Sequence, residues 1–208
     1  GAWDYTPEEM ERIAREASAA GASEIHMVGG LHPDYSLSYY AELMTRLKTA
    51  APGIHVKAFT AVEISWFARR SGKSAREVLS LLREAGLDSL PGGGSEIFDP
   101  EVFAELIKGK DGVDAWMEVH RAWHGMGGRS TATMLYGHVE GFEHRVDHLR
   151  RLRDLQDETS GFTSFIPLAF HPANTPLSAL PGPSGFDDLK TLAISRIYLD
   201  NFDHIKAY

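Results

Sequence analysis

Helical and strand-like segments alternate along nearly the whole chain, and this alternation limits the possible folds more than any other feature. Helical segments are expected at residues 6–20, 36–51, 74–85, 113–126, 142–157 and 186–201. Those at residues 6–20 and 74–85 begin at capping boxes. The strand-like segments are short apolar runs at residues 24–30, 54–61, 87–91, 130–136, 162–170 and 205–208. This order is typical of a parallel sheet covered by helices, so we expect an α/β fold.

Both ends of the chain interrupt that pattern. The sequence opens with a helix and closes on the start of a strand, whereas a (β/α) barrel opens with a strand and has eight of them. We therefore expect residues 1–208 to form one incomplete domain, a partial parallel (β/α) barrel of the TIM type that is truncated at both ends. A flavodoxin-like doubly wound sheet is the alternative. The barrel is favoured because polar or glycine-rich residues follow nearly every predicted strand, as at the C-terminal rim of a barrel.

Charge and composition exclude several classes of function. The formal net charge of -8 repels phosphate backbones and anionic membranes, and no apolar stretch approaches the length of about 20 residues that spans a bilayer. We expect a soluble, cytoplasmic protein that acts on a small molecule and binds neither nucleic acid nor membrane. The 208 residues contain no cysteine, which excludes disulfides and cysteine-held metal centres within them.

The residues that follow the predicted strands are rich in glycine, histidine and glutamate. A glycine pair at a strand end lets the backbone approach a ligand closely, although it can equally serve a tight turn. Several such ends in one chain favour a binding site shared between strands. The candidates are Gly29, Gly30, His32, Glu63, the segment Gly92–Glu96, Gly137, His138, Glu140, His171 and Asn174.

The histidines on the predicted helices fall into two pairs. His120 and His124 share a helical face with Trp123, so we expect them in the core or at its boundary rather than as metal ligands. His144 and His148 are expected on the flank of their helix away from Val146 and Leu149, in a solvated or interfacial position.

Three further histidines come directly after predicted strands. His32, His138 and His171 could bind zinc together with a carboxylate. A metal-dependent hydrolase barrel is therefore the alternative from a different class of enzyme.

Long, non-repetitive motifs resemble one known family. They are VGGLHPD (28–34), HVKAFTAVEI (55–64), GLDSLPGGGSEIFDPEV (86–102), TMLYGHVE (133–140), HRVDHLRRLRDLQDETSGF (144–162), FIPLAFHP (165–172) and LDNFDHIKAY (199–208). Together they resemble the aminofutalosine synthases, which are radical S-adenosylmethionine (SAM) enzymes. Dehypoxanthine futalosine cyclases and the deazaflavin chromophore synthase subunits share the general scheme, but the FTAVEI and LPGGG segments favour the aminofutalosine synthases.

The resemblance implies a radical enzyme of menaquinone biosynthesis. In that family a [4Fe–4S] cluster on a CxxxCxxC loop, reduced by an external one-electron donor, cleaves SAM to a 5′-deoxyadenosyl radical. The radical adds to the enol ether of 3-[(1-carboxyvinyl)oxy]benzoate, so SAM is a consumed cosubstrate. The protein's task is to orient the reactants and to keep water away.

The resemblance also implies roles for the residues at the strand ends. Gly29 and Gly30 match the glycine pair that meets the methionine amino group of SAM, although Leu31 stands where an acidic residue is usual. Leu135 corresponds to the residue that packs on adenine, and Gly137 to a glycine of close approach.

These two residues belong to a GxIxGxxE-like motif that ends at Glu140 and departs from the family at Thr133, where the first glycine is expected. Asn174 replaces a glycine in the turn after the sixth barrel strand, and asparagine tolerates the left-handed conformation.

The remaining strand-end residues are candidates for ribose or substrate contacts. A cap or surface role is the alternative for the carboxylates and the serine among them, and Asp99 is expected to cap a helix that starts at Pro100. The candidates are His32, Glu63, Ser95, Glu96, His138 and His171.

The missing cysteines leave three explanations. The chain is a fragment of a complete enzyme, a deliberately shortened version of one, or a cluster-free binding or structural module. We favour the fragment, because Gly1 falls about where the cluster loop would have ended. On this interpretation the isolated chain is expected to be inactive.

Overall fold

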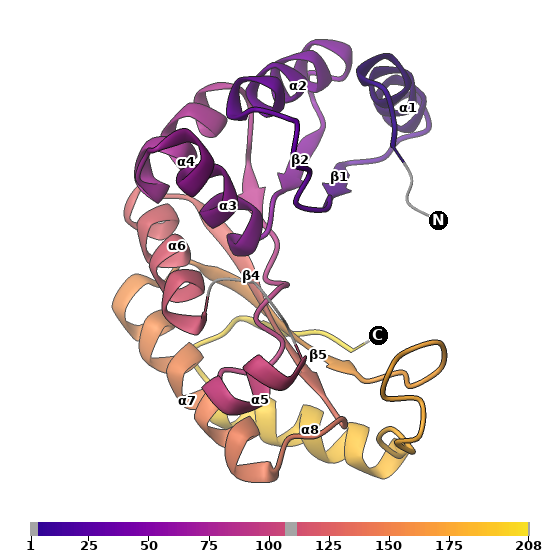
Figure 1. Ribbon diagram of the computed structural model, residues 1–208, viewed down its shortest axis with the longest axis vertical. Helices are drawn as coiled ribbons and strands as arrows, with labels where there is room; N and C mark the ends of the chain where they lie inside the picture. Colours follow the sequence, from indigo (N-terminus) through magenta and orange to yellow (C-terminus); the bar gives the residue numbers. More distant parts are fainter. Residues whose placement is uncertain (1–3, 107–111, 208) are drawn as a thin grey trace. The chain divides into compact units, whose positions relative to one another are not determined.

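The computed structural model describes residues 4–106 and 112–207 (Figure 1). The chain divides into two compact units, residues 1–91 and residues 92–208. Within each unit every recorded strand pair is parallel. The expected α/β fold with parallel strands is therefore confirmed.

The first unit begins with a helix and contains three strands in the order β1-β2-β3. Its helix α1 starts at a capping box in which Thr6 and Glu9 bond each other's backbone N–H groups. Helix α4 starts in the same way at Ser74 and Glu77. The elements are α1 Pro7–Ala19, β1 Glu24–Met27, α2 Leu37–Ala50, β2 His55–Ala58, α3 Ala61–Ser71, α4 Ala75–Glu84 and β3 Ser89–Leu90.

The two faces of β2 differ in burial. Val56 and Ala58 are fully buried in the core of the first unit, whereas His55 and Lys57, which point to the opposite face, are half-buried. Alternate residues of a strand lie on opposite faces, so one face packs on helices and the other carries polar side chains. The helices supply the core residues Leu43, Met44, Leu47, Ile64, Phe67, Val78, Leu79 and Leu82.

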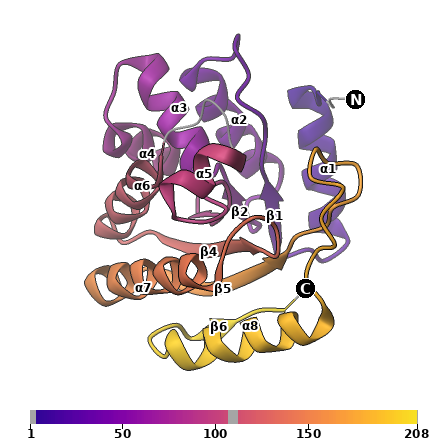
Figure 2. The same cartoon turned by 60° about the horizontal axis from the view of Figure 1, so that its bottom comes forward.

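The second unit holds the longest strands, in the order β4-β5-β6. Helix α7 packs on β4 and α8 packs on β5 (Figure 2). Asp99 accepts hydrogen bonds from the N–H groups of Glu101 and Val102, so its predicted role as a helix cap is confirmed. The elements are α5 Pro100–Leu106, α6 Val113–Gly125, β4 Arg129–Tyr136, α7 Phe142–Thr159, β5 Phe162–Ala169, α8 Gly185–Tyr198 and β6 His204–Ile205.

The strand order argues against the doubly wound alternative. A flavodoxin-like sheet places its first strand between the second and third, so its order reverses at a switch point. In each unit the order instead follows the sequence without reversal, as successive units of a (β/α) barrel do.

One predicted element was wrong. The strand expected at residues 54–61 ends at Ala58, and helix α3 begins at Ala61. The physical reason is a capping box at Thr60 and Glu63, which starts a helix directly after the strand. The predicted final strand is limited to His204–Ile205, and Tyr208 lies outside the described residues.

Candidate functional site

The glycine turn after β1 is held by a carboxylate from α3. The N–H of Gly29 donates a 3.0 Å hydrogen bond to Oε1 of Glu63. The other oxygen of Glu63, Oε2, accepts from the backbone N–H and the hydroxyl of Thr60, each at 2.8 Å. Glu63 is only 4% exposed, so its carboxylate anchors the turn and caps α3 at the same time.

The loop beyond this turn carries a stack of aromatic rings. The ring of His32 lies 3.9 Å from that of Tyr35, which in turn lies 4.2 Å from the ring of Tyr39. Nδ1 of His32 accepts a hydrogen bond from the N–H of Asp34. His32 therefore presents an aromatic surface beside the glycine turn.

Strands β1, β2 and β3 carry a polar face, formed by Glu24, His26, His55, Lys57 and Ser89, that was not predicted. Nζ of Lys57 lies 2.9 Å from Oε1 of Glu24, and Nε2 of His55 lies 2.7 Å from the hydroxyl of Ser89. His26 is the register partner of Lys57. The alternation of polar and apolar residues in HVKA could have revealed this face from the sequence.

In the second unit, the Gly92 peptide is clamped between two threonines of β4. The N–H of Gly92 donates to Oγ1 of Thr131 at 3.0 Å, and the hydroxyl of Thr133 donates to the carbonyl of Gly92 at 2.9 Å. A Cβ at Gly92 would lie 2.5 Å from the backbone of Ala132, so only glycine allows this approach.

The next residues of this segment lead to Leu135. Glu96 adopts a positive φ of 49°, and its carbonyl accepts a hydrogen bond from the N–H of Leu135 at 2.9 Å. Ser95 is 1% exposed, and its hydroxyl has no hydrogen-bond partner among the described residues. Such a buried hydroxyl is free to bond a ligand.

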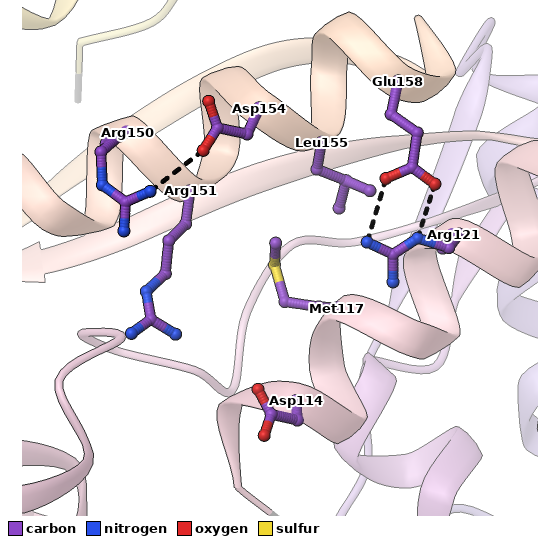
Figure 3. Close-up of a pocket in the computed structure, with 8 residues that line it drawn as sticks. All are labelled: Asp114, Met117, Arg121, Arg150, Arg151, Asp154, Leu155 and Glu158. Carbon is purple, nitrogen blue, oxygen red and sulfur yellow. Dashed lines mark hydrogen bonds and ion pairs between the residues drawn. The ribbon is translucent and has the colours of Figure 1, made fainter.

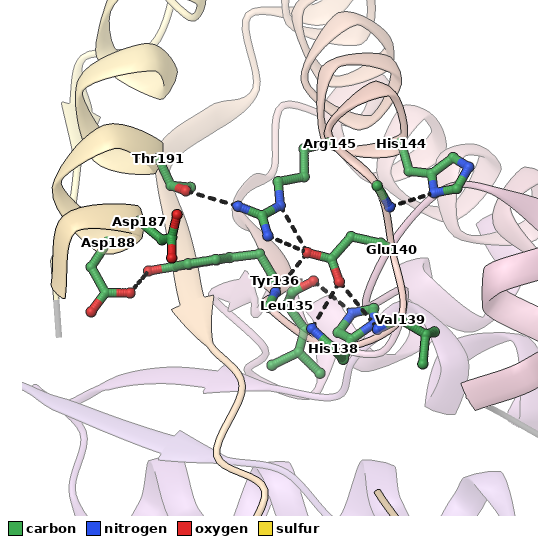
Figure 4. Close-up of polar contacts among 12 residues, drawn as sticks. Leu135, Tyr136, His138, Val139, Glu140, His144, Arg145, Asp187, Asp188 and Thr191 are labelled. Atoms are coloured by element: carbon green, nitrogen blue, oxygen red, sulfur yellow. Dashed lines mark hydrogen bonds and ion pairs between the residues drawn. The ribbon is translucent and has the colours of Figure 1, made fainter. Parts of the chain in front are cut away.

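Glu140 closes the loop after β4. Its carboxylate accepts from the N–H groups of Gly137 at 2.6 Å and His138 at 2.9 Å, and Nδ1 of His138 lies 3.0 Å from Oε2 (Figure 4). Desolvation raises the pKa of Glu140, but the hydrogen bonds from the His138 side chain and Gly137 outweigh it and lower the pKa to about 2. The side chain of Glu140 is fully buried, so it shapes the loop from within.

A brace from two helices supports this carboxylate (Figure 4). The guanidinium of Arg145 lies 2.7 Å from Oε1 of Glu140 and donates to the hydroxyl of Thr191 on α8 at 3.2 Å. The same guanidinium lies 5.1 Å from the ring centre of Tyr136, whose hydroxyl donates to Asp188 at 2.7 Å. The loop at Gly137 is therefore fixed to both α7 and α8.

The turn after β5 keeps its expected shape. Asn174 has a φ of 62°, which confirms that asparagine takes the left-handed conformation in place of glycine. The N–H of Thr175 and its hydroxyl both bond the carbonyl of Pro172. His171 is exposed at the start of this segment.

The helical histidines are buried, and one prediction about them was wrong. His120 is fully buried and His124 is 7% exposed, as expected for core residues. His148 was expected on a solvated or interfacial flank but is fully buried, because α7 buries the stripe that includes Leu149 and Leu152 and leaves Val146 exposed. Nδ1 of His148 accepts from the N–H of Phe98, and Nε2 donates to the carbonyl of Thr133.

A surface pocket between α6 and α7 is a poorer candidate (Figure 3). Two of its arginines are paired with carboxylates of the same pocket, Arg121 with Glu158 at 2.7 Å and Arg150 with Asp154 at 3.1 Å. Its charges are therefore largely satisfied within the protein.

Residues 1–152 match the family described as the Radical SAM superfamily. The chain therefore belongs to the radical SAM superfamily. Two solved structures share its fold. Methylornithine synthase superimposes with a TM-score of 0.77 at 19% identity, covering 98% of this chain and 55% of that one. SuiB of Streptococcus suis gives 0.65 at 14% identity, covering 98% and 43%. The expected partial (β/α) barrel of the radical SAM kind is confirmed.

Three curated relatives have higher sequence identity to the chain than these two solved structures. The chain is 48% identical to aminodeoxyfutalosine synthase of Thermus thermophilus, covering 100% of this chain and 57% of that protein. It is 44% identical to 5-amino-6-(D-ribitylamino)uracil--L-tyrosine 4-hydroxyphenyl transferase of Methanoculleus marisnigri, covering 93% and 54%. It is 45% identical to FO synthase of Mycobacterium leprae, covering 99% and 24%. The chain thus spans about half the length, or less, of these relatives.

The residues present do not supply a metal centre of the superfamily's kind. The 208 residues contain no cysteine thiolate to hold an iron–sulfur cluster. Among the described residues, no group of three or more His, Asp or Glu side chains is placed to hold a metal ion. In the same part of the chain no helix is long and apolar enough to cross a membrane.

Proposed function

We propose that this chain is part of an aminofutalosine synthase, which joins the 5′-deoxyadenosyl group of SAM to 3-[(1-carboxyvinyl)oxy]benzoate in menaquinone biosynthesis. The observation that carries the proposal is the 48% identity to the Thermus thermophilus enzyme over the whole chain. The segments FTAVEI and LPGGG support it as well. The activity belongs to the whole protein, and the chain by itself is expected to be inactive.

The strand-end residues take distinct roles in this proposal. The backbone at Gly29 and Gly30 meets the methionine part of SAM, and Leu135 packs on adenine, two residues before the glycine of close approach, Gly137. The buried hydroxyl of Ser95 is a donor for the ribose or the substrate. His32, Glu96, His138 and His171, which lie in the segments after β1, β3, β4 and β5, are the candidates for substrate contacts.

Glu63 and Glu140 act as positioning residues. Each carboxylate already accepts backbone N–H groups of the turn that it supports. Each therefore affects a ligand through the turn rather than by direct contact.

Redox chemistry comes from outside these residues. In radical SAM enzymes a reduced iron–sulfur cluster supplies the electron that cleaves SAM, and an external donor reduces that cluster. What this chain contributes is binding, orientation and exclusion of water. We further propose that residues 1–208 belong to one barrel domain, since the superposition on methylornithine synthase extends over 98% of the chain, and that the protein works in the cytoplasm.

The proposal is tested on the whole reconstituted protein with SAM and a reductant. We expect 5′-deoxyadenosyl transfer to 3-[(1-carboxyvinyl)oxy]benzoate, detected as aminofutalosine by mass spectrometry. Product from tyrosine and 5-amino-6-(D-ribitylamino)uracil instead would assign the chain to the transferases. Binding of SAM without any cleavage would favour a non-catalytic module.

A matched pair of variants tests the adenine contact. Leu135→Ala should raise the KM for SAM, because the half-buried leucine loses its packing surface. Leu180→Ala removes a half-buried leucine from the loop before α8 and serves as the control. Equal KM values for the two variants would remove Leu135 from the site.

A further inference from the structure

The polar face of the first unit gathers two histidines and a lysine on neighbouring strands. Lys57 on β2 is the register partner of His26 on β1 and of Ser89 on β3. Parallel strands lie about 4.8 Å apart, so these side chains are immediate neighbours on one face. His55, two residues before Lys57, shares that face and lies opposite Glu24.

The one ammonium group of this face is paired with one carboxylate. Glu24 is its single carboxylate among these strand residues, and it lies 2.9 Å from Nζ of Lys57 and 3.9 Å from Nε2 of His55. The side chain of Glu24 is 41% exposed, whereas that of Lys57 is 14% exposed. Lys57 is therefore held in place by a carboxylate that solvent can reach.

Fold stability does not explain this arrangement. A partly exposed ion pair contributes at most about 1 kcal/mol. Side chains such as Val, Ile and Leu usually fill the inner face of a (β/α) barrel. On β2 the apolar residues Val56 and Ala58 point to the helices instead, and the ionisable residues occupy the other face.

The position of the face relates it to the glycine turn. His26 precedes Gly29 by three residues on β1, and Lys57 precedes Thr60 by three residues on β2. A strand rises about 3.3 Å per residue, so the strand positions of His26 and Lys57 lie roughly 10 Å from the glycine turn, measured along the strands. A ligand held at the turn and a second small molecule at Lys57 would therefore be neighbours within one unit.

We propose that Lys57, with His26 beside it, binds the carboxylate of an aromatic acid substrate and is a specificity-determining residue. The inference rests on the proposed function, because it names the residue that binds the benzoate carboxylate of the proposed substrate. An ammonium group forms short, charge-assisted hydrogen bonds to a carboxylate. Glu24 orients Lys57 in the empty protein and competes with the incoming anion.

The test measures binding of 3-methoxybenzoate, with neutral 3-methoxybenzamide as the matched ligand, by NMR titration of the protein. We expect the benzoate to bind and the amide to bind at least about tenfold more weakly. Lys57→Met should weaken benzoate binding by about tenfold or more, and Lys57→Arg should retain most of it. Lys73→Met, at an exposed lysine of the same unit, is the control and should change nothing.

A second variant should change the affinity for benzoate in the opposite direction. Glu24→Gln removes the competing carboxylate and should tighten benzoate binding severalfold. Because Glu24 is exposed, this variant is expected to fold even if Lys57→Met does not. Equal binding of benzoate and benzamide, unchanged affinity in Lys57→Met, or weaker binding in Glu24→Gln would each overturn the proposal. Formation of aminofutalosine by the whole reconstituted protein decides the proposed function separately, whichever way the binding experiment falls.

Discussion

The hydroxyl of Thr133 donates a 2.9 Å hydrogen bond to the carbonyl oxygen of Gly92. Thr133 stands at the position where the resemblance predicts a glycine, and its hydroxyl holds Gly92 in place. Thr131 completes the clamp by accepting from the N–H of the same residue. Both polar groups of the Gly92 peptide are satisfied by side chains of β4.

Replacing Thr133 tests this clamp. Thr133→Val keeps the shape but leaves a buried carbonyl without its donor, which should reduce the free energy of unfolding by about 1–3 kcal/mol. Thr133→Ser keeps the hydroxyl and should stay closer to the wild type. Urea denaturation of the three proteins gives the comparison. A valine variant as stable as the serine variant would show that the hydrogen bond contributes nothing.

Replacing Glu140 should be among the most destabilising single changes in the second unit. Glu140→Gln removes the buried charge that pairs with the half-buried Arg145 and leaves a backbone N–H without its acceptor, with an expected loss of about 3–5 kcal/mol. Glu158→Gln breaks the exposed pair with Arg121 and should have little effect. Thermal unfolding of both variants measures the difference, and similar melting temperatures would contradict it.

The stabilisation from Glu140 should also depend on pH. Its pKa in the folded protein is lowered from 4.5 to about 2. A lowered carboxyl pKa stabilises the fold above the unfolded value, and that stabilisation is lost as the pH falls from 4.5 towards 2. The loss in that range should be smaller in Glu140→Gln, as measured by urea denaturation at several pH values.

Three buried histidines should make the protein sensitive to mild acid. Burial lowers the pKa of His148 to about 3 and of His124 to about 4, and it lowers that of His120 as well. Between pH 6.5 and 4 the unfolded chain binds protons that the folded protein does not, so stability falls as the pH falls. Each group contributes up to about 1.4 kcal/mol per pH unit.

His148→Gln isolates one of these groups. The variant should lose stability less steeply than the wild type between pH 6.5 and 4, by about one proton. His204→Asn, at an exposed histidine, is the control. Equal slopes in all three proteins would show that His148 titrates normally.

A side chain at Gly137 should strain the loop for two separate reasons. Gly137 has a φ of 89°, and a Cβ there would lie 2.5 Å from the ring of Pro183. Gly137→Ala should therefore lower stability by about 1–3 kcal/mol. Gly53→Ala, where nothing lies within 4 Å, is the control. Adding Pro183→Ala should recover only the part due to the clash, and a full recovery would show that φ is unimportant.

Much of the fold could be predicted because local signals agree with the final structure. The capping boxes at Thr6 and Ser74 and the apolar runs at β4 and β5 mark elements that formed as expected. Helix α3 was missed because its cap, Thr60, follows an apolar run so closely that the run was extended through it. The error arose where a strand gives way to a helix within two residues.

The site was harder to predict, because its contacts join residues far apart in sequence. Glu63 and Gly29 are separated by 34 positions, and the partners of His148 lie at Phe98 and Thr133. No periodicity within one helix reveals such a partner. The face of α7 that carries His148 was misjudged because Val146 was taken as the buried residue, although it is 48% exposed.

The carboxylate of Glu63 caps the start of α3 and also fixes the turn at Gly29. The two elements therefore form one cooperative unit, since neither loses its hydrogen bonds without disturbing the other. By thermodynamic reciprocity, a ligand that orders the glycine turn must also protect the first turn of α3 from opening. Occupation of the site would be recorded as slower amide hydrogen exchange along a helix that the ligand does not touch.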